Sequence, residues 1–456
     1  MRKKIPALFL MLCLTIMPFA GCGGSSTGQD TTAPAPTTQS QPSETAAQEA
    51  PSGGEEITLT IWDWDEAHLT HMTSLYRETN PNVSFETLIV MPTDFMQKLQ
   101  SALAADMDVP DIILGELLYR GRLFELGILD DLSQTPYHVN RDEMFDFAVQ
   151  LQTGPNGELL GVEQQICPSG FAYRRDLARE YLGTDDPDEI AALIPTWDAF
   201  IEQGRNVVQK SGGSVHIFPG ISVMVYETLK GQKPSSYIEG NKINLTERYL
   251  PMFELAARMN QENILGNQER ETPALNSGFA DGTFLFFPCP PWAAKWNIAA
   301  SDPDGSGNWG LTKAPEGGFT RGGTSVSIYS GSPNKEAAWD YVKFVYCDGD
   351  GVKEAFEQFG FMTGFKAPYQ DANSYFFTIP GAFDEFFGGQ NLAEYYINEI
   401  SVETQGQVQT RHESTIHNAL LAVVAQMAND KSITAQQAME LLKQETATMI
   451  PEAEII

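Results

Sequence analysis

The chain has 456 residues, with 60 Asp and Glu against 29 Lys and Arg, and a formal charge of −31. This balance excludes a nucleic-acid-binding protein, because neutralising phosphates requires clustered basic residues, and the 42% hydrophobic content excludes a disordered chain. The length exceeds the roughly 250–300 residues at which a single core stops growing, so two lobes are expected.

The amino-terminal segment has the features of a secretory signal. Basic residues at positions 2–4 precede an apolar stretch at 7–20, which is shorter than the roughly 20 residues of a membrane span. The stretch ends at Phe19-Ala20-Gly21-Cys22, which resembles the bacterial lipobox except that Phe19 stands where Leu is usual. The resemblance implies a lipoprotein signal peptide at 1–21 and a lipid anchor on Cys22. The alternative is an ordinary secretory signal with an incidental cysteine.

Residues 22–56 are predicted to be the lipidated cysteine followed by a flexible linker. Positions 23–56 contain no aromatic residue, Leu, Ile, Val or Met, so this segment cannot offset its ordering entropy by burying apolar area. As a coil it would span about 30 Å on average. No later segment has a long uncharged apolar run, so we expect an extracytoplasmic globular part that is held to the cell membrane at one end.

From residue 57 the chain alternates between strand and helix patterns. Strands are predicted at 57–62, 83–90 and 111–114, with amphipathic helices between them. This βαβ order is typical of an open sheet covered by helices, in which ligands bind beyond the carboxyl ends of the strands.

A second α/β set is predicted from about residue 170. Thr196 is expected to cap a helix that begins at Trp197. The other predicted elements are strands at 284–287 and 324–329 and helices at 334–345, 412–427 and 434–449.

Several short motifs occur in an order that resembles a known family. They are IWDW at 61–64, PDII at 110–113, LGILDDL at 126–132, GELLGV at 157–162, FAYRRDL at 171–177, PTWDAF at 195–200, FADGTF at 279–284, GGTS at 322–325 and EAAWDYV at 336–342. Together they resemble the bacterial extracellular solute-binding proteins of ABC importers, the maltose-binding-like group. Leu160 replaces the family's usual aromatic residue, and Glu163 its usual proline.

The resemblance implies an α/β fold with two lobes of the type II periplasmic-binding-protein kind and a ligand cleft between them. The first lobe would comprise 57–168 and 305–365, and the second 169–304 and 366–456. The implied function is to capture a carbohydrate, expected to be an oligosaccharide, by hinge closure and to deliver it to the transmembrane subunits of an ABC permease. We expect a monomer without cofactor or enzymatic activity.

The residues that follow the first strand are the main candidates for a ligand site. Sugars present an apolar face and a ring of hydroxyls, which suit indoles combined with carboxylates. Trp62, Asp63, Trp64 and Asp65 supply both. If the strand continues, alternation places Trp62 and Trp64 on one side and the two carboxylates on the other. The alternative is one core Trp and a solvated acidic loop.

Further candidates follow from the same rule or from the resemblance. Glu116 and Tyr119 come after the third strand. Trp292 matches the family's pocket tryptophan, whereas Trp296 could equally belong to the core. The remaining candidates are Gln164 and Gln165 at the expected first crossover, and Gly322 and Gly323, which would let backbone amides approach a ligand.

Other chemistries find less support in the sequence. His412 and His417 are one residue too far apart for a zinc-binding HExxH motif, and no metal site is predicted. A surface-anchored glycoside hydrolase with Asp63 and Asp65 as acid and base is the alternative function. Cys167 and Cys289 are expected to be buried free thiols, with a bridge between them left open.

Overall fold

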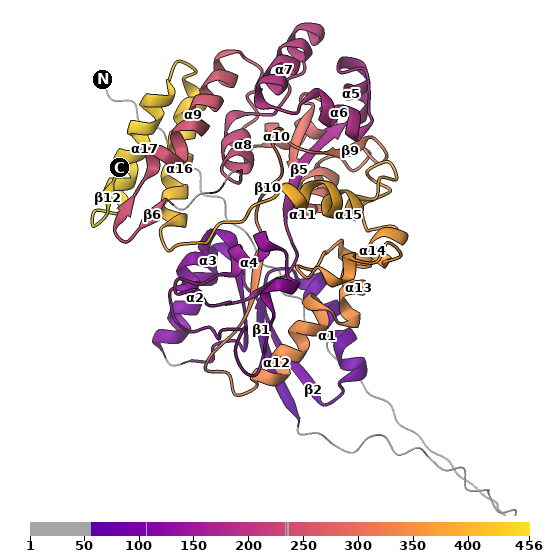
Figure 1. The fold of residues 1–456 in the computed structure, drawn as a ribbon, viewed down its shortest axis with the longest axis vertical. Coiled ribbons are helices and arrows are strands. Elements are labelled where there is room, and N and C mark those ends of the chain that lie inside the picture. Colours follow the sequence, from indigo (N-terminus) through magenta and orange to yellow (C-terminus); the bar gives the residue numbers. More distant parts are fainter. Residues whose placement is uncertain (1–55, 106, 233, 235–236) are drawn as a thin grey trace, which may run out of the picture. The chain divides into compact units, whose positions relative to one another are not determined.

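The computed structural model describes residues 56–105, 107–232, 234 and 237–456, which form a mixed α/β fold (Figure 1). The predicted signal peptide, Cys22 and the linker up to residue 55 lie outside the described residues. Among the described residues, none of the helices is long and apolar enough to cross a membrane.

The first sheet has five strands in the order β2-β1-β3-β11-β4. The strands are β1 (Ile57–Asp63), β2 (Val83–Ile89), β3 (Ile112–Glu116), β4 (Val162–Glu163) and β11 (Thr324–Ile328). β1, β2 and β3 are parallel, and β11 runs antiparallel to both of its neighbours. The predicted βαβ alternation is confirmed. We call this sheet, with the helices that cover it, the first lobe.

Helices cover both faces of the first sheet. They are α1 (Glu66–Thr79), α2 (Pro92–Ala104), α3 (Leu117–Phe124), α4 (Asp146–Gln152), α12 (Lys335–Val342) and α13 (Asp350–Phe359). Successive strand residues point to opposite faces, so Ile61 packs with residues of α1 and α12, while Trp62 packs with residues of α2 and α3. Each face therefore has its own apolar core.

The second sheet is built around β5, against which its other strands run antiparallel. Its strands are β5 (Pro168–Arg174), β8 (Phe286–Cys289), β9 (Trp309–Thr312) and β10 (Phe319–Thr320). We call this sheet with its helices the second lobe. A small third sheet comprises β6 (Ile238–Glu239), β7 (Lys242–Ile243) and β12 (Glu454–Ile455).

The second lobe contains most of the remaining helices. They are α5 (Arg175–Tyr181), α6 (Pro187–Leu193), α7 (Trp197–Ser211), α8 (Ile221–Met224), α9 (Leu245–Gln261), α10 (Pro273–Asp281), α11 (Pro291–Ala293), α14 (Tyr375–Thr378), α15 (Leu392–Tyr395), α16 (Glu413–Asn429) and α17 (Ala435–Met449). The Thr196 side chain accepts a hydrogen bond from the amide of Ala199, which confirms the predicted cap. The two helices predicted near the carboxyl end are α16 and α17.

Short 3-10 and π turns complete the secondary structure. They are η1 (Arg141–Glu143), η2 (Val225–Leu229), η3 (Ala294–Ala299), η4 (Lys343–Cys347), η5 (Ala367–Tyr369), η6 (Tyr396–Ile400) and η7 (Ser401–Glu403).

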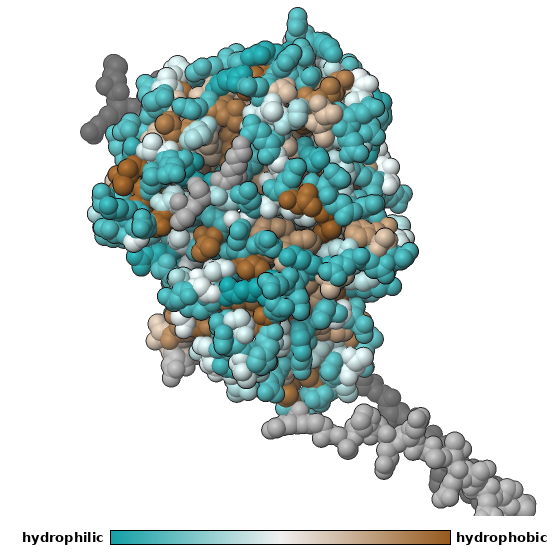
Figure 2. Space-filling view, viewed as in Figure 1, coloured by the Kyte–Doolittle hydropathy of each residue, from teal (hydrophilic) through white to brown (hydrophobic). Residues whose placement is uncertain are grey.

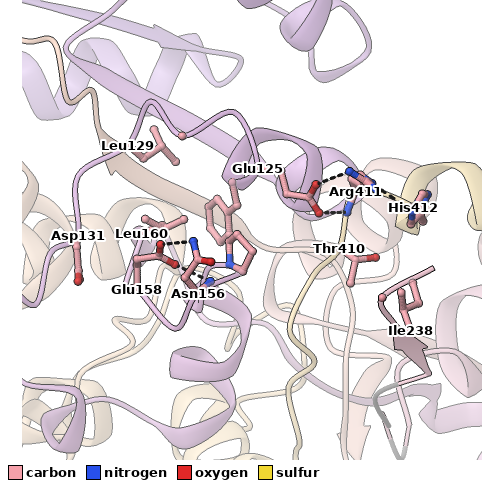
Figure 3. Close-up of a pocket in the computed structure, with 14 residues that line it drawn as sticks. Glu125, Leu129, Asp131, Asn156, Glu158, Leu160, Ile238, Thr410, Arg411 and His412 are labelled. Carbon is pink, nitrogen blue, oxygen red and sulfur yellow. Dashed lines mark hydrogen bonds and ion pairs between the residues drawn. The ribbon is translucent and has the colours of Figure 1, made fainter. Parts of the chain in front are cut away.

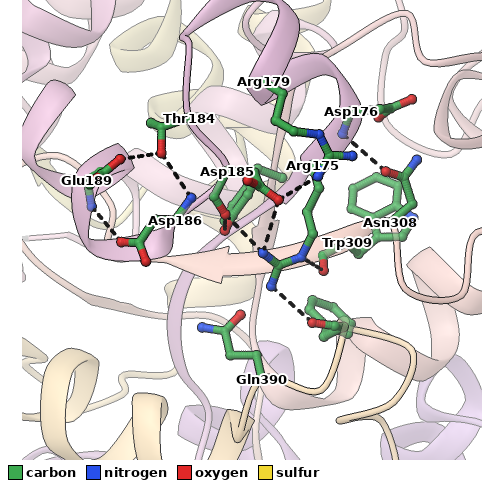
Figure 4. Close-up of polar contacts among 12 residues, drawn as sticks. Arg175, Asp176, Arg179, Thr184, Asp185, Asp186, Glu189, Asn308, Trp309 and Gln390 are labelled. Carbon is green, nitrogen blue, oxygen red and sulfur yellow. Dashed lines mark hydrogen bonds and ion pairs between the residues drawn. The ribbon is translucent and has the colours of Figure 1, made fainter.

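A partly buried arginine, Arg175, ties β9 to the surrounding loops of the second lobe (Figure 4). The Arg175 guanidinium donates to the carbonyl oxygens of Trp309 at 2.8 Å, Asp185 at 2.9 Å and Phe387 at 3.1 Å. A planar guanidinium has enough donors to satisfy three carbonyls at once. These hydrogen bonds hold together three segments that are far apart in the sequence.

Two neighbouring connections carry the chain between the sheets. Residues 164–167 link β4 to β5, and residues 321–323 link β10 to β11. They are joined by hydrogen bonds from the amide of Gln164 to the Thr324 carbonyl at 2.8 Å and from the amide of Arg321 to the Cys167 carbonyl at 3.4 Å. The chain returns to the first sheet at Thr324, later than the expected residue 305, because β9 and β10 pair with β5.

Polar and apolar surface are distributed as the composition leads one to expect. Hydrophilic residues dominate the face in Figure 2, and the hydrophobic ones form small separate patches. The cysteines at 167, 289 and 347 are buried and free, as predicted for Cys167 and Cys289, so these two do not form a bridge.

Candidate functional site

A cavity of about 360 Å³ lies at the carboxyl ends of the parallel strands of the first sheet. Its wall from the first lobe follows β1, β2 and β3, where the open-sheet rule places ligands. Nine of the twelve predicted ligand-site residues line it. They are Trp64, Asp65, Glu116, Gln164, Gln165, Trp292, Trp296, Gly322 and Gly323.

Two of the other predicted residues, Trp62 and Tyr119, belong to the apolar core instead. The Trp62 indole meets the Phe95 ring edge-on at 6.0 Å between centroids, and the Tyr119 ring stacks on Phe95 at 5.6 Å. Both side chains are buried, and the Tyr119 hydroxyl donates to the Leu114 carbonyl at 3.3 Å. The structure places them in the core and not on the cavity wall, because α2 covers this face of the sheet and supplies Phe95.

The third, Asp63, is fully buried beneath the turn that presents Trp64 and Asp65. Its Oδ1 accepts hydrogen bonds from the amides of Trp64 at 2.6 Å and Asp65 at 3.0 Å, so the carboxylate shapes the turn. Burial raises the pKa of Asp63 to about 7. Because β1 ends at Asp63 and α1 begins at Glu66, strand alternation stops here. Trp64 and Asp65 therefore reach the same cavity, contrary to the expected alternation.

Asp65 stands at the boundary between the two lobes. Its carboxylate caps α1 by accepting from the amide of His68 at 3.2 Å, and it lies 3.8 Å from the Lys295 ammonium of η3. The Asp63–Asp65 pair is a poor acid–base pair for glycoside hydrolysis, because Asp63 is sealed from solvent.

The second lobe contributes aromatic side chains on α11 and η3. The Trp292 indole donates from Nε1 to the Arg321 carbonyl at 3.1 Å, and the Arg321 guanidinium lies 4.4 Å from the ring centroid. Trp296 is 57% exposed and therefore does not belong to the core. The cavity thus has an indole from the first lobe, Trp64, and two from the second.

Gly322 and Gly323 lie in the connection between β10 and β11, at positions where a side chain would be strained and crowded. Their φ angles are +71° and +117°, in the region that favours glycine. A Cβ would lie 3.0 Å from Trp292 Nε1 at the first position and 3.0 Å from Glu163 Oε2 at the second. Glycine at these positions lets the backbone lie close to the Trp292 indole and to the Glu163 carboxylate.

Glu163, next to Gly323, belongs to a buried ion pair. Arg120 Nη1 and Glu163 Oε1 are 2.8 Å apart, both side chains are buried, and Gln152 Nε2 donates to the same carboxylate oxygen at 2.7 Å. The departure of Glu163 from the family's usual proline is thereby explained. Sequence reasoning missed Arg120. The signal that could have led to it was the charged residue at position 163, since a buried carboxylate requires a cationic partner.

The remaining predicted residues are polar groups on the cavity wall. Glu116 is half-buried, its carboxylate accepts from the amide of Leu118 at 2.8 Å, and burial raises its pKa. Gln164 and Gln165 are buried in the first connection between the lobes. Met91 and Pro92, which follow β2, also line the cavity. The rule that ligands bind beyond the carboxyl ends of parallel strands points to Met91 and Pro92, because they directly follow Val90.

Another cavity, of about 580 Å³, lies elsewhere and contains none of the predicted site residues (Figure 3). Its polar wall includes the Arg411–Glu125 ion pair at 3.4 Å, and the Glu158 carboxylate accepts from Asn156. Indoles are absent from its wall, which makes it a poorer sugar site. Within the described ranges, no group of three or more His, Cys, Asp and Glu side chains is placed to hold a metal ion.

Comparisons with known proteins agree with the fold. The model of the bacterial extracellular solute-binding protein family matches residues 73–378. The lactose-binding protein of Rhizobium radiobacter is 25% identical over 368 residues, which cover 75% of this chain and 83% of that protein.

Solved structures of similar fold include an extracellular solute-binding protein of family 1, with a TM-score of 0.76 at 18% identity, covering 86% of this chain and all of that one. The sugar-binding protein MalE from Xanthomonas citri has a TM-score of 0.71 at 17% identity, covering 87% of this chain and 98% of that one. These likenesses confirm the two-lobed fold. The family match spans more than half of the sequence, and the chain belongs to the bacterial extracellular solute-binding proteins.

Proposed function

We propose that this protein captures an oligosaccharide in the cavity that Trp64 and Trp292 line, and delivers it to the transmembrane subunits of an ABC permease. The observation that carries the proposal is that one cavity receives indoles from both lobes together with carboxylate and amide groups. Indoles stack on the apolar faces of sugar rings, while Asp65, Glu116 and Gln165 can bond hydroxyls. The names of the lactose-binding relative and of MalE support the same ligand class.

Hinge closure is the mechanism that the connections support. Residues 164–167 and 321–323 run side by side between the sheets, and both contribute to the cavity wall. A ligand that contacts Trp64 and Trp292 has more contacts when the lobes are closed, and it therefore shifts the population toward the closed form. We retain the division of the chain into two lobes as part of this proposal, with the first lobe resuming at Thr324.

Trp64→Ala and Trp292→Ala are each expected to weaken sugar binding by about 5- to 150-fold, the equivalent of about 1–3 kcal/mol. The physical reason is the loss of apolar stacking area while the polar wall is retained. Calorimetry with lactose, maltose and longer malto-oligosaccharides measures the affinities, with recovery of unaltered sugar as evidence that no catalysis occurs. Unchanged affinity in both variants for a sugar that the parent binds would place the site elsewhere.

The matched control for that experiment is Trp197→Phe. Trp197 is buried at the start of α7 and packs on Phe171 and Phe200, away from the cavity wall. This variant is expected to lose stability without losing affinity. A parallel loss of affinity would mean that the effects of the cavity variants report general unfolding.

We also propose that the protein works outside the cytoplasm as a monomer, held to the cell membrane by a lipid on Cys22. The supporting features are the lipobox-like ending of the signal and the extracellular family. Cys22→Ala should move the protein from the detergent-soluble membrane fraction into the medium, as followed by immunoblotting. Retention of the variant in the membrane fraction would contradict the anchor.

A further inference from the structure

A cavity of about 200 Å³, which we call the second cavity, adjoins the cavity that Trp64 and Trp292 line. The two share Glu116, Trp292 and Gly322 in their walls, so they meet along this line of residues. A ligand of two or more sugar rings that is stacked on Trp292 can therefore extend into the second cavity. The rest of this wall differs in character, because it carries several charged side chains.

Basic side chains outnumber acidic ones in the wall of the second cavity. Lys230, Arg270 and Arg321 line it together with two carboxylates, Glu116 and Glu413. In the whole chain, by contrast, 60 acidic residues stand against 29 basic ones. Three basic side chains on the wall of one cavity in so acidic a protein favour an anionic group of the ligand.

Lys230 and Arg270 lie nearer the open space than their buried partners Glu413 and Glu227, and Arg270 also contacts the exposed Glu271. The side chains of Lys230 and Arg270 are 21% and 24% exposed, whereas that of Glu413 is 5% exposed. Buried behind them, Glu227 contacts Arg270 Nε at 2.9 Å and Arg321 Nη2 at 2.6 Å. The inner carboxylate thus fixes the position of two guanidinium groups.

Aromatic rings complete the support of these cations. The Arg270 guanidinium lies 4.4 Å from the centroid of Tyr226, and the Lys230 ammonium lies 5.8 Å from the same centroid. Arg321 Nη1 is buried and has no hydrogen-bond partner in the part of the chain that the structure describes. Cations held over rings in this way are preorganised, and less ordering is required when an anion binds.

We propose that the second cavity is a subsite for a sugar carboxylate, so that the preferred ligand is an oligosaccharide with a uronic acid residue. This inference rests on the proposed function: one ring stacks on the tryptophans, and the adjoining acidic ring places its carboxylate between Lys230 and Arg270. A singly charged carboxylate suits the wall better than a phosphate dianion, because Glu116 and Glu413 repel additional negative charge. Arg270 can bind a carboxylate through more than one N–H group.

The test compares disaccharides that differ only in this charge. Aldobiouronic acids, each paired with the neutral disaccharide of the same linkage, are titrated into the full chain and followed by calorimetry. For at least one pair the acidic sugar is expected to bind about tenfold or more tightly than its neutral counterpart. Raising the salt concentration should weaken binding of the acidic sugar more than binding of the neutral one.

Two substitutions locate the effect. Arg270→Gln and Lys230→Gln are each expected to reduce the preference for the acidic sugar by about tenfold, measured as the ratio of the two affinities. Having both variants keeps the test open if one of them fails to fold. The control is Arg411→Gln, because Arg411 is exposed and lines the separate cavity of Figure 3. It should keep the parent's ratio.

The outcomes separate this inference from the proposed function. If neutral disaccharides bind and no acidic counterpart binds more tightly, the carboxylate subsite is wrong and the oligosaccharide function stands. If neither kind of sugar binds, while the parent is folded, the proposed function fails. A preference for the acidic sugar that survives in both variants would also overturn the assignment to Lys230 and Arg270.

Discussion

Arg120→Met is expected to lower the free energy of unfolding by about 3–5 kcal/mol. The Arg120 side chain is fully buried, and its guanidinium donates to the carbonyls of Gly115 at 3.1 Å and Leu151 at 3.3 Å as well as to Glu163. Removing it leaves the Glu163 carboxylate buried without its cation. Burial already raises the pKa of Glu163, and the loss of Arg120 removes the main opposing influence.

Urea denaturation of the parent and the variant measures this difference. The matched control is Arg179→Gln, since Arg179 forms a more exposed ion pair with Asp185 at 2.6 Å and should change stability by less than about 1 kcal/mol. The double variant Arg120→Met/Glu163→Met should recover much of the loss, because it leaves no unpaired buried charge. If Arg120→Met is as stable as Arg179→Gln, the pair does not support the first lobe.

The sequence predicted the position of the cavity because that position depends on local patterns. Strand and helix periodicity around Ile61, Val90 and Leu114 established the order of parallel strands, and the open-sheet rule then pointed to the residues after them. Trp64, Asp65 and Glu116 are at the cavity for that reason. The family resemblance supplied Trp292, which lies in a different lobe and has no local signal that connects it to β1.

The residues whose positions differ from the prediction depend on contacts between distant elements. Trp62 and Trp64 both meet the Phe95 ring edge-on, but Trp62 is buried within β1, whereas Trp64 follows the end of the strand and lines the cavity. Likewise, Arg120 and Glu163 are 43 residues apart, so their pairing depends on how β3, α3 and β4 meet. Such contacts are set by tertiary structure and leave no periodic pattern in the sequence.

The pH dependence of stability is expected to contain a large contribution from Asp63. Burial raises its pKa to about 7 in the folded protein, from 3.8 when it is unperturbed. The folded state therefore binds this proton more tightly than the unfolded state does, and stability decreases as the pH rises from about 4 to about 7. Above that range the contribution is constant. A pKa difference of this size corresponds to about 4 kcal/mol.

Asp63→Asn should abolish that decrease, because the amide stays neutral while its oxygen can still accept from the amides of Trp64 and Asp65. Relative to the parent, the variant should gain up to about 4 kcal/mol between pH 4 and pH 8, measured by urea denaturation at several pH values. Asp142→Asn makes the same substitution at an exposed carboxylate and is expected to follow the parent throughout. If the Asp63 and Asp142 variants show the same pH dependence, Asp63 is ionised in the folded protein across this range. The turn beneath Trp64 would then be built around a buried charge held by two backbone amides, and not around a neutral carboxyl group.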